Sequence, residues 1–285
     1  MADITDKISN YLEFQKGMYG DELPYDRNVI REVLAQFAKE KATSGTATKI
    51  ETGAKSIKSE LHSPASNVSA DYKFNTQQAA AAKPSTPIKP EIPEYLLAIS
   101  SLDELREKIC NCMACPLGKT RKNFVFGTGN PNADILIIGE GPGAEEDAQG
   151  KPFVGRSGQL LTKIIEAIKF TRDEVFIANI VKCRPPENRR PEVNEIDACE
   201  PYLKRQIDLI KPQFILALGL TAVDTLFKKK HRMGDIRGKL QNYHGIPTLA
   251  TYHPAALLRN PNLKRDTWED VKFLRRLYDE KNANQ

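Results

Sequence analysis

Cysteine spacing is the first feature of this sequence that points to chemistry. Cys112 and Cys115 form a C-x-x-C motif, Cys183 and Cys199 supply two further thiols from a distant segment, and Cys110 stands outside this set. Four thiolates can hold either a zinc ion or a [4Fe–4S] cluster, and the spacing does not distinguish the two. Buried cysteines without any metal are the alternative interpretation. We favour a metal centre held by Cys112, Cys115, Cys183 and Cys199.

A glycine-rich, acidic loop is the second such feature. Residues 135–138 are a short apolar run, typical of a strand buried on both faces of a parallel sheet, and Gly139-Glu-Gly-Pro-Gly follows it. Open α/β sheets bind their ligands at the carboxyl ends of such strands. The glycines let the backbone approach a flat ligand, so the sequence predicts a pocket floor here. The acidic residues that follow, Glu145, Glu146 and Asp147, are expected to form a solvated helix start or turn.

Alternating strands and helices are expected to position these residues. Apolar runs predict strands at 135–138, 175–181, 214–218 and 247–252. Ser101-Leu-Asp-Glu predicts a helix start, and amphipathic spacing predicts further helices at 160–168, 192–210, 221–228 and 266–278. The short connections between them imply an α/β fold, a three-layer α/β/α sandwich with a central, mainly parallel four-stranded sheet.

The chain has a different character before this domain. Helix-like spacing of apolar residues predicts a small helical arm over residues 1–41. Residues 42–94 are rich in Ala, Thr, Ser, Lys and Pro and cannot bury enough surface to offset chain entropy, so we expect a disordered linker. The α/β domain is assigned to residues 95–285. The arm is a candidate docking segment for a protein partner.

The composition favours a soluble protein. Apolar residues make up 40% of the 285 residues, and the mean hydropathy is -0.48. No apolar run is long enough to cross a bilayer and the N-terminus has no apolar leader, so we expect a cytoplasmic protein that does not contact membranes. That setting also disfavours disulfides. The formal charge of +5 permits an anionic partner without requiring one.

Four segments of the domain together resemble the family 4 uracil-DNA glycosylases. They are Gly139-Glu-Gly-Pro-Gly-Ala-Glu-Glu-Asp, Gly150-Lys-Pro-Phe-Val-Gly, Asn179-Ile-Val-Lys-Cys-Arg-Pro-Pro and His253-Pro-Ala-Ala-Leu-Leu-Arg. The resemblance covers roughly residues 95–280 and does not extend to the first ninety or so. Since members of that family hold a [4Fe–4S] cluster with a C-x-x-C and two later cysteines, it favours iron–sulfur over zinc here.

The resemblance also implies roles for individual residues. Glu140 and Gly141 would lie in the first catalytic motif, where Glu140 either activates the attacking water or balances charge. Backbone groups from Gly139 onward would hold the uracil edge. Phe153 would stack on the flipped base, and Asn179 would read its Watson–Crick edge. His253 would lie against uracil O2 as the ring departs with negative charge.

These roles suit the chemistry of N-glycosidic bond cleavage. The reaction produces an oxocarbenium-like sugar and a uracil anion, so donors placed where the anion's charge develops accelerate it most. His253 with backbone N–H groups fits that requirement, and a carboxylate such as Glu140 can orient water. An asparagine amide offers one donor and one acceptor, which match uracil O4 and N3–H and mismatch the edge of cytosine.

A stiff, basic loop and an apolar pair are the candidates for DNA contact. Arg184, Arg189 and Arg190 surround Cys183 in a proline-rich stretch that could clamp phosphates. An ordinary solvated loop is the alternative. Arg259 could extend this surface, and Leu257 or Leu258 could be the wedge that replaces the extruded base.

Two functions of different class remain open. The first is an enzyme that removes uracil from single- or double-stranded DNA as the first step of base-excision repair, acting as a monomer with turnover. The second is a non-catalytic iron–sulfur nucleic-acid-binding module of a repair or replication assembly. The presence of Glu140, Asn179 and His253 favours the enzyme, because a pure binding module would be free to lose them. An iron–sulfur electron-transfer protein fits the glycine-rich loop poorly.

Overall fold

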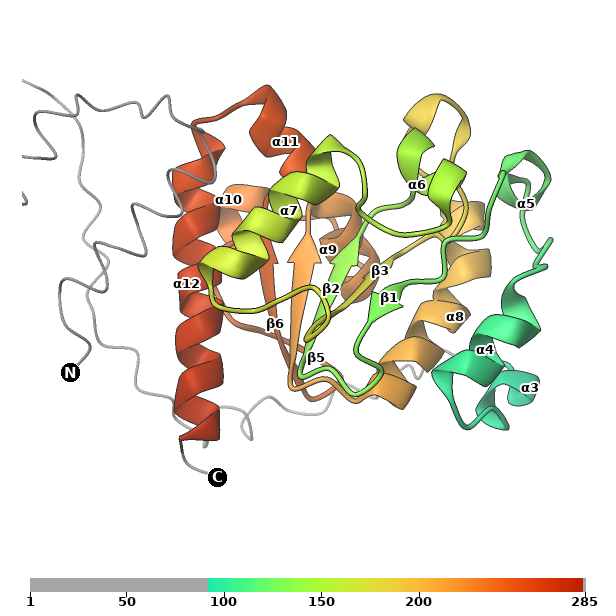
Figure 1. Ribbon diagram of the computed structural model, residues 1–285, viewed down its shortest axis with the longest axis horizontal. Helices are drawn as coiled ribbons and strands as arrows, with labels where there is room; N and C mark the ends of the chain where they lie inside the picture. The colour runs from blue at the N-terminus through green and yellow to red at the C-terminus, as the bar shows by residue number, and fades with distance from the viewer. Residues whose placement is uncertain (1–91, 284–285) are drawn as a thin grey trace, which may run out of the picture. The chain divides into compact units, whose positions relative to one another are not determined.

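One six-stranded sheet organises the part of the chain that the computed structural model describes, residues 92–283. Its strand order is β1-β3-β2-β4-β6-β5, and the four central strands run parallel (Figure 1). The strands are β1 (Thr128–Gly129), β2 (Ile135–Gly139), β3 (Phe176–Asn179), β4 (Phe214–Leu218), β5 (Gln241–Tyr243) and β6 (Ile246–Thr251). The four predicted strands are thus confirmed as the parallel centre of the sheet. The short antiparallel edge strands β1 and β5 were not predicted, because so few residues give no periodic signal.

Alternating side chains of the central strands pack into two separate hydrophobic cores, one on each face of the sheet. Ile135 and Ile137 of β2 belong to the core on one face, whereas Leu136 and Ile138 belong to the core on the other. All four are at most 2% exposed, as expected for a strand covered on both faces. The predicted three-layer sandwich is therefore confirmed for the described residues.

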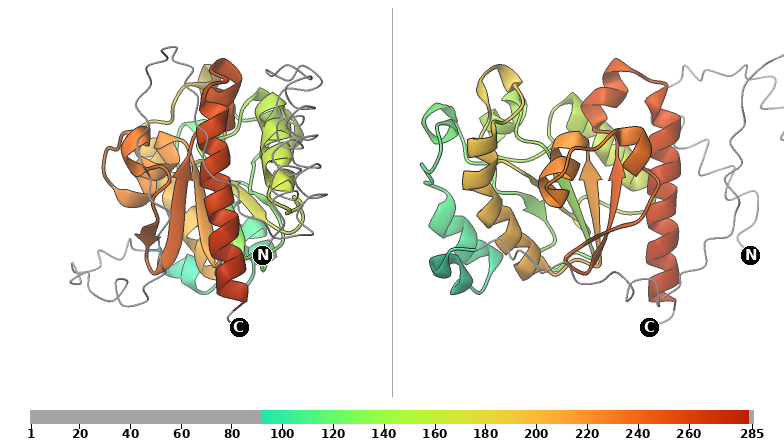
Figure 2. Two further views of the ribbon diagram at one scale, coloured as in Figure 1. Left: turned by 90° about the vertical axis from the view of Figure 1, so that its left-hand side faces the viewer. Right: turned by 180° about the vertical axis from the view of Figure 1, so that it is seen from behind.

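Helices cover both faces of the sheet, as the edge-on view in Figure 2 shows. The first face is covered by α7 (Arg156–Ala167), α11 (Pro254–Arg259) and α12 (Leu263–Asn282). The second is covered by α8 (Val193–Ile210), α9 (Leu220–Phe227) and α10 (Met233–Ile236). The remaining helical segments are α3 (Glu94–Leu97), α4 (Leu102–Ile109), α5 (Leu117–Thr120), α6 (Ala144–Gln149) and the single 3₁₀ turn η1 (Pro186–Asn188). Of these, α3 and α4 pack against α8, and the Oγ of Ser101 caps α4 as predicted by accepting from the Glu104 N–H at 3.2 Å.

The carboxyl ends of the four parallel strands meet at one edge of the sheet, which we call the carboxyl edge. It is formed by Gly139, Asn179, Leu218 and Thr251, the last residues of β2, β3, β4 and β6. The loops that leave these residues lead to α6, η1, α9 and α11, and in Figure 1 α6 and α11 lie above the ends of the strands. This edge is where an open α/β sheet binds its ligand.

The predicted helical arm over residues 1–41 lies outside the described residues, as does all of the predicted linker 42–94 before residue 92. The described chain is already helical at Glu94, one residue before the domain boundary predicted from the sequence. Within the described residues, no helix combines the length and the apolar character that a membrane span requires.

The acidic residues after the glycine-rich loop do start a helix, α6, but they are not all solvated as predicted. Asp147 is 2% exposed, and its Oδ1 accepts the backbone N–H groups of Lys122 at 2.9 Å and Asn123 at 3.2 Å. The Asn123 amide returns the contact by donating to the Asp147 carbonyl at 2.7 Å. Asp147 therefore joins α6 to the segment that leads into β1.

We expect Asp147→Ala to lower the free energy of unfolding by about 2–4 kcal/mol, because it leaves two backbone N–H donors without a buried acceptor. Urea unfolding followed by circular dichroism measures this change. The matched control is Glu145→Ala, which removes an exposed carboxylate from the same helix and should change stability by less than about 0.5 kcal/mol. Equal effects of the two substitutions would contradict the assigned role of Asp147.

Candidate active site

A cavity of about 710 Å³ opens at the carboxyl edge. Its lining includes the predicted residues Glu140, Gly141, Phe153, Asn179 and His253, which come from the ends of three strands and from the loop before α7. The structure thus brings together residues that lie more than 110 positions apart in the sequence. The folding of four parallel strands to one edge is what makes this possible.

Gly139 creates the space in which two of these side chains converge. A Cβ atom at this position would lie 2.5 Å from Cζ of Phe153 and 2.6 Å from Oδ1 of Asn179. Both distances are shorter than real carbon contacts allow, so any other residue would push the two side chains apart. Gly139 is therefore required for the shape of the cavity floor.

Asn179 contributes a buried polar side chain to the cavity lining. The residue is 2% exposed, and its Oδ1 is buried with no hydrogen-bond partner among residues 92–283. Since a buried polar atom left unpaired is costly, such an atom at a cavity wall indicates a place for a ligand donor. The backbone carbonyl of Asn179 is held separately, by the buried ammonium of Lys182 at 2.9 Å, which also donates to Oε1 of Gln206 at 2.5 Å.

Phe153 packs in the hydrophobic core and also lines the cavity. It is 6% exposed and belongs to the core on the α7 face, yet its ring also lines the cavity. Its φ of 52° is unusual for a bulky residue and turns the chain sharply before α7. The ring lies 5.5 Å from that of His253 between centroids, tilted by 33°. A flat ligand on the Phe153 ring would lie within reach of His253.

Glu146 is a site residue that the sequence analysis missed. Its Oε1 accepts the backbone N–H groups of Val154 and Gly155, both at 2.9 Å, and its Oε2 accepts that of Gly143 at 3.2 Å. The carboxylate thereby joins the glycine-rich loop to the loop that carries Phe153. A glutamate at the third position of a helix is the sequence signal of such capping, and it follows Gly143 here.

His253 is held as a neutral donor. It is the N-cap of α11, and its Nδ1 accepts the Ala255 N–H at 3.2 Å. Burial lowers the pKa of His253 to about 4, and the positive charge of Arg259 acts in the same direction. Since Nδ1 is an acceptor in a neutral ring, the proton lies on Nε2. His253 can therefore donate a hydrogen bond to a ligand without being charged.

Glu140 is also part of the cavity lining. It follows Gly139 at the end of β2, and its Oε2 accepts a hydrogen bond from Oγ1 of Thr221 in the first turn of α9. No other side-chain hydrogen bond holds this carboxylate among residues 92–283. Thr221 was not among the residues singled out from the sequence, because a threonine within an apolar helix gives no signal of its own.

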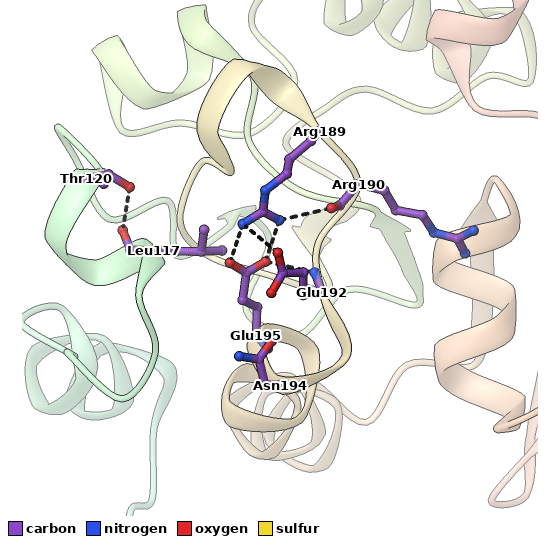
Figure 3. Close-up of polar contacts among 7 residues, drawn as sticks. All are labelled: Leu117, Thr120, Arg189, Arg190, Glu192, Asn194 and Glu195. Atoms are coloured by element: carbon purple, nitrogen blue, oxygen red, sulfur yellow. Dashed lines mark hydrogen bonds and ion pairs between the residues drawn. The ribbon is translucent and has the colours of Figure 1, made fainter.

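The predicted basic loop is only partly available for DNA. Arg189 donates to both carboxylate oxygens of Glu195, at 2.7 and 2.8 Å, and Figure 3 shows its guanidinium turned toward that residue. Its charge is therefore paired within the protein. Arg190 points away from this pair and lies 3.5 Å from Asp224, with 49% of its side chain exposed. Arg184 donates to the neutral amide oxygen of Asn188, at 2.8 Å.

The two leucines offered as a wedge differ in exposure. Leu257 is fully buried in the core beneath α11, which rules it out as an exposed wedge and corrects that part of the prediction. Leu258 is 39% exposed. Arg259 is exposed at the end of the same helix and lines the cavity. Adjacent residues of a helix point about 100° apart, so Leu257 packs into the core while Leu258 faces solvent.

The four predicted metal ligands lie near one another at the α8 side of the sheet. Burial raises the pKa of the Cys183 thiol, and the neighbouring Cys115 and Cys112 act in the same direction. Cys199 behaves likewise, with burial as the main cause and Cys183 and Cys115 as neighbours. Cys110 instead donates to the carbonyl of Glu107 in its own helix, at 3.3 Å.

Hydrogen-bond donors surround the sulfurs of this group. Arg121 donates to Cys183 Sγ at 3.2 Å and to the carbonyl of Cys112 at 2.6 Å, so it joins the C-x-x-C segment to the second pair of cysteines. The backbone N–H of Lys182 donates to Cys199 Sγ at 3.3 Å. Donors of this kind stabilise thiolates. Among residues 92–283 no group of three or more His, Cys, Asp or Glu has the arrangement of a single-ion site.

Comparison with known proteins adds to this geometry. The model of the uracil DNA glycosylase superfamily matches residues 126–276, more than half of the chain. The chain is 46% identical to the type-4 uracil-DNA glycosylase of Sulfurisphaera tokodaii, over 63% of this chain and 86% of that protein. It is 47% identical to the type-4 enzyme of Saccharolobus solfataricus (61% and 85% covered) and 42% identical to that of Thermotoga maritima (60% and 91%). With the cavity at the carboxyl edge described above, these matches show that the chain belongs to the type-4 branch of the uracil-DNA glycosylase superfamily.

Proposed function

We propose that the chain is a uracil-DNA glycosylase, which hydrolyses the N-glycosidic bond of a flipped-out deoxyuridine in DNA. The products are free uracil and an abasic site, the first step of base-excision repair. The observation that supports this function most strongly is that one cavity is lined by both Asn179, whose Oδ1 has no partner among residues 92–283, and His253, a neutral donor. These two groups match the two polar edges of uracil.

Base recognition follows from Asn179. Its free Oδ1 accepts from uracil N3–H, and its amide N–H donates to O4. Cytosine presents an acceptor and a donor at the corresponding positions, so both contacts become repulsive. Phe153 supplies the stacking surface, and Gly139 leaves the room that the ring requires. Extruding the base costs a few kcal/mol, which this stacking offsets.

Departure of the base depends on His253. As the bond between C1′ and N1 breaks, its electron pair leaves with the uracil ring, and negative charge develops on O2. The neutral ring of His253 donates from Nε2 to that oxygen. Because the donor is fixed by the α11 N-cap and buried, it stabilises the transition state without having to reorganise.

Glu140 acts on the other reactant. Its carboxylate orients a water molecule, whose oxygen forms the new bond to C1′. The water gives up one proton, and the departing uracil anion takes up one proton, so the reaction is balanced. The negative charge of Glu140 also stabilises the positive charge on the sugar. Hydrolysis is thereby completed with the chain's own side chains.

DNA contact involves side chains of the loop after Cys183 and of α11, two segments that contribute residues to the cavity lining. Arg184, Arg190 and Arg259 are the candidates for phosphate contact, and Leu258 is the candidate wedge. Arg189 serves to hold the loop in shape through Glu195. We propose that the protein acts on DNA as a monomer.

The cysteine group fits a [4Fe–4S] cluster, with Cys112, Cys115, Cys183 and Cys199 as ligands. Four thiols with nearby N–H donors and an arginine suit a thiolate-bound cluster. When bound, the cluster would cross-link the C-x-x-C segment to α8 and would supply no step of the hydrolysis.

Release of uracil from a single-uracil oligonucleotide tests the proposed function. Anaerobically purified protein should produce alkali-labile abasic sites, and His253→Ala should reduce the single-turnover rate by about 100- to 1,000-fold. The matched control is His244→Asn in the β5–β6 hairpin, which should keep the wild-type rate. Wild-type protein that binds the oligonucleotide without releasing uracil would overturn the proposal in favour of a binding module.

The pH dependence of cleavage tests the state of His253. Its pKa of about 4 lies below the usual value of 6.5, so the ring stays neutral throughout the range above about pH 5. The single-turnover rate, measured from pH 5 to 8 at constant ionic strength, should show no ionisation near 6.5 that belongs to this residue. A rate that falls as the pH rises through about 6.5, in a limb that His253→Ala removes, would show that the ring is protonated in the active form.

Removal of single cysteines tests the cofactor assignment. Cys199→Ser should lose bound iron and the visible absorption at about 400 nm that thiolate-bound clusters give, because one of four ligands is removed. Cys110→Ser is the matched control and should retain both, since Cys110 bonds within its own helix. Colourless wild-type protein that contains zinc would show that the thiolates hold a different metal.

A further inference from the structure

The orientation of Glu140 depends on one described partner. Its Oε2 accepts from Thr221 Oγ1, and this is the hydrogen bond that fixes the carboxylate within residues 92–283. A glutamate side chain has three rotatable bonds and loses considerable freedom when it is held in one position. Without Thr221, nothing in the described structure would select one orientation of this carboxylate over others.

The position of Thr221 is itself well determined. Thr221 is 4% exposed and lies at the second residue of α9. The helix begins directly after β4, which lies between β2 and β6 in the sheet. Glu140 follows the end of β2, and His253 follows the end of β6. Gly219 starts the turn with a φ of 85°, and its N–H donates to the Thr251 carbonyl at 2.9 Å, which fastens α9 to the end of β6.

Gly219 also explains how this turn fits between the two catalytic candidates. A Cβ on Gly219 would lie 3.0 Å from the Cβ of His253. The turn is therefore packed against His253 on one side, while Thr221 reaches Glu140 on the other. One short segment therefore lies close to both groups.

We propose that Thr221 is a positioning residue for the hydrolysis, which holds the Glu140 carboxylate in the orientation that receives the attacking water. The inference rests on the glycosylase function proposed above. With Oε2 occupied by the Thr221 hydroxyl, Oε1 is the oxygen that meets the water. Base recognition does not depend on Thr221, because Asn179, Phe153 and His253 supply those contacts.

Single-turnover cleavage of a uracil oligonucleotide, measured over a range of protein concentrations, tests this assignment. Thr221→Val keeps the shape of the side chain but removes the donor, and it should lower the maximal rate about 10- to 100-fold. The half-saturating protein concentration should stay within about twofold of wild type, since ground-state binding is not altered. Thr221→Ser keeps the hydroxyl and should restore most of the rate.

A matched control and a double-mutant cycle separate this role from a structural one. Thr225→Val removes a buried hydroxyl one turn later in the same helix, outside the cavity lining, and should leave the rate unchanged. In the Glu140→Ala background, Thr221→Val should have no further effect, because the carboxylate that it positions is gone. Thermal melts identify any variant that fails to fold, and Thr221→Ala replaces Thr221→Val in that case.

Several results would overturn the inference. They are a wild-type rate in Thr221→Val or Glu140→Ala, an undiminished loss from Thr221→Val in the Glu140→Ala background, and failure of Thr221→Ser to restore the rate. A loss confined to the half-saturating concentration would also overturn it. Wild-type protein that releases no uracil is a different result, because it rejects the proposed function itself.

Discussion

Parallel pairing of four strands is the constraint on which the rest of the structure depends. It places the last residues of β2, β3, β4 and β6 at one edge, so that every strand contributes one turn to the same cavity. In the register of β2 and β3, Gly139 is paired with Asn179, which sets the asparagine beside a position that has no side chain. The chemistry of the site therefore follows from backbone hydrogen bonds as much as from its side chains.

Much of this arrangement was predictable because it depends on local patterns. Short apolar runs located the four central strands, and the glycines after Ile138 marked the cavity floor. The cysteine spacing picked out four thiols that the fold brings near one another. Each of these signals lies within a few residues of sequence or in a spacing that chemistry restricts, so no tertiary contact had to be known in advance.

The roles of charged and polar residues were harder to predict because they depend on distant partners. Glu146 and Asp147 read as solvated acids, yet they accept backbone N–H groups from other loops. Arg189 read as a phosphate ligand, yet Glu195 pairs with its charge. Thr221 gave no signal, because its partner lies 81 residues earlier in the chain. A single sequence does not reveal which side chains form hydrogen bonds or ion pairs with each other across long sequence separations.

The absence of a side chain at Gly139 also limits how this site can evolve. Any substitution there brings a Cβ atom against both Phe153 and Asn179, so the position offers no gradual route to a wider or narrower base pocket. Selection for a larger purine base would have to act first on the loop that carries Phe153, which is anchored by the Glu146 carboxylate. A directed-evolution library would therefore gain more from varying residues 150–155 than from varying the end of β2.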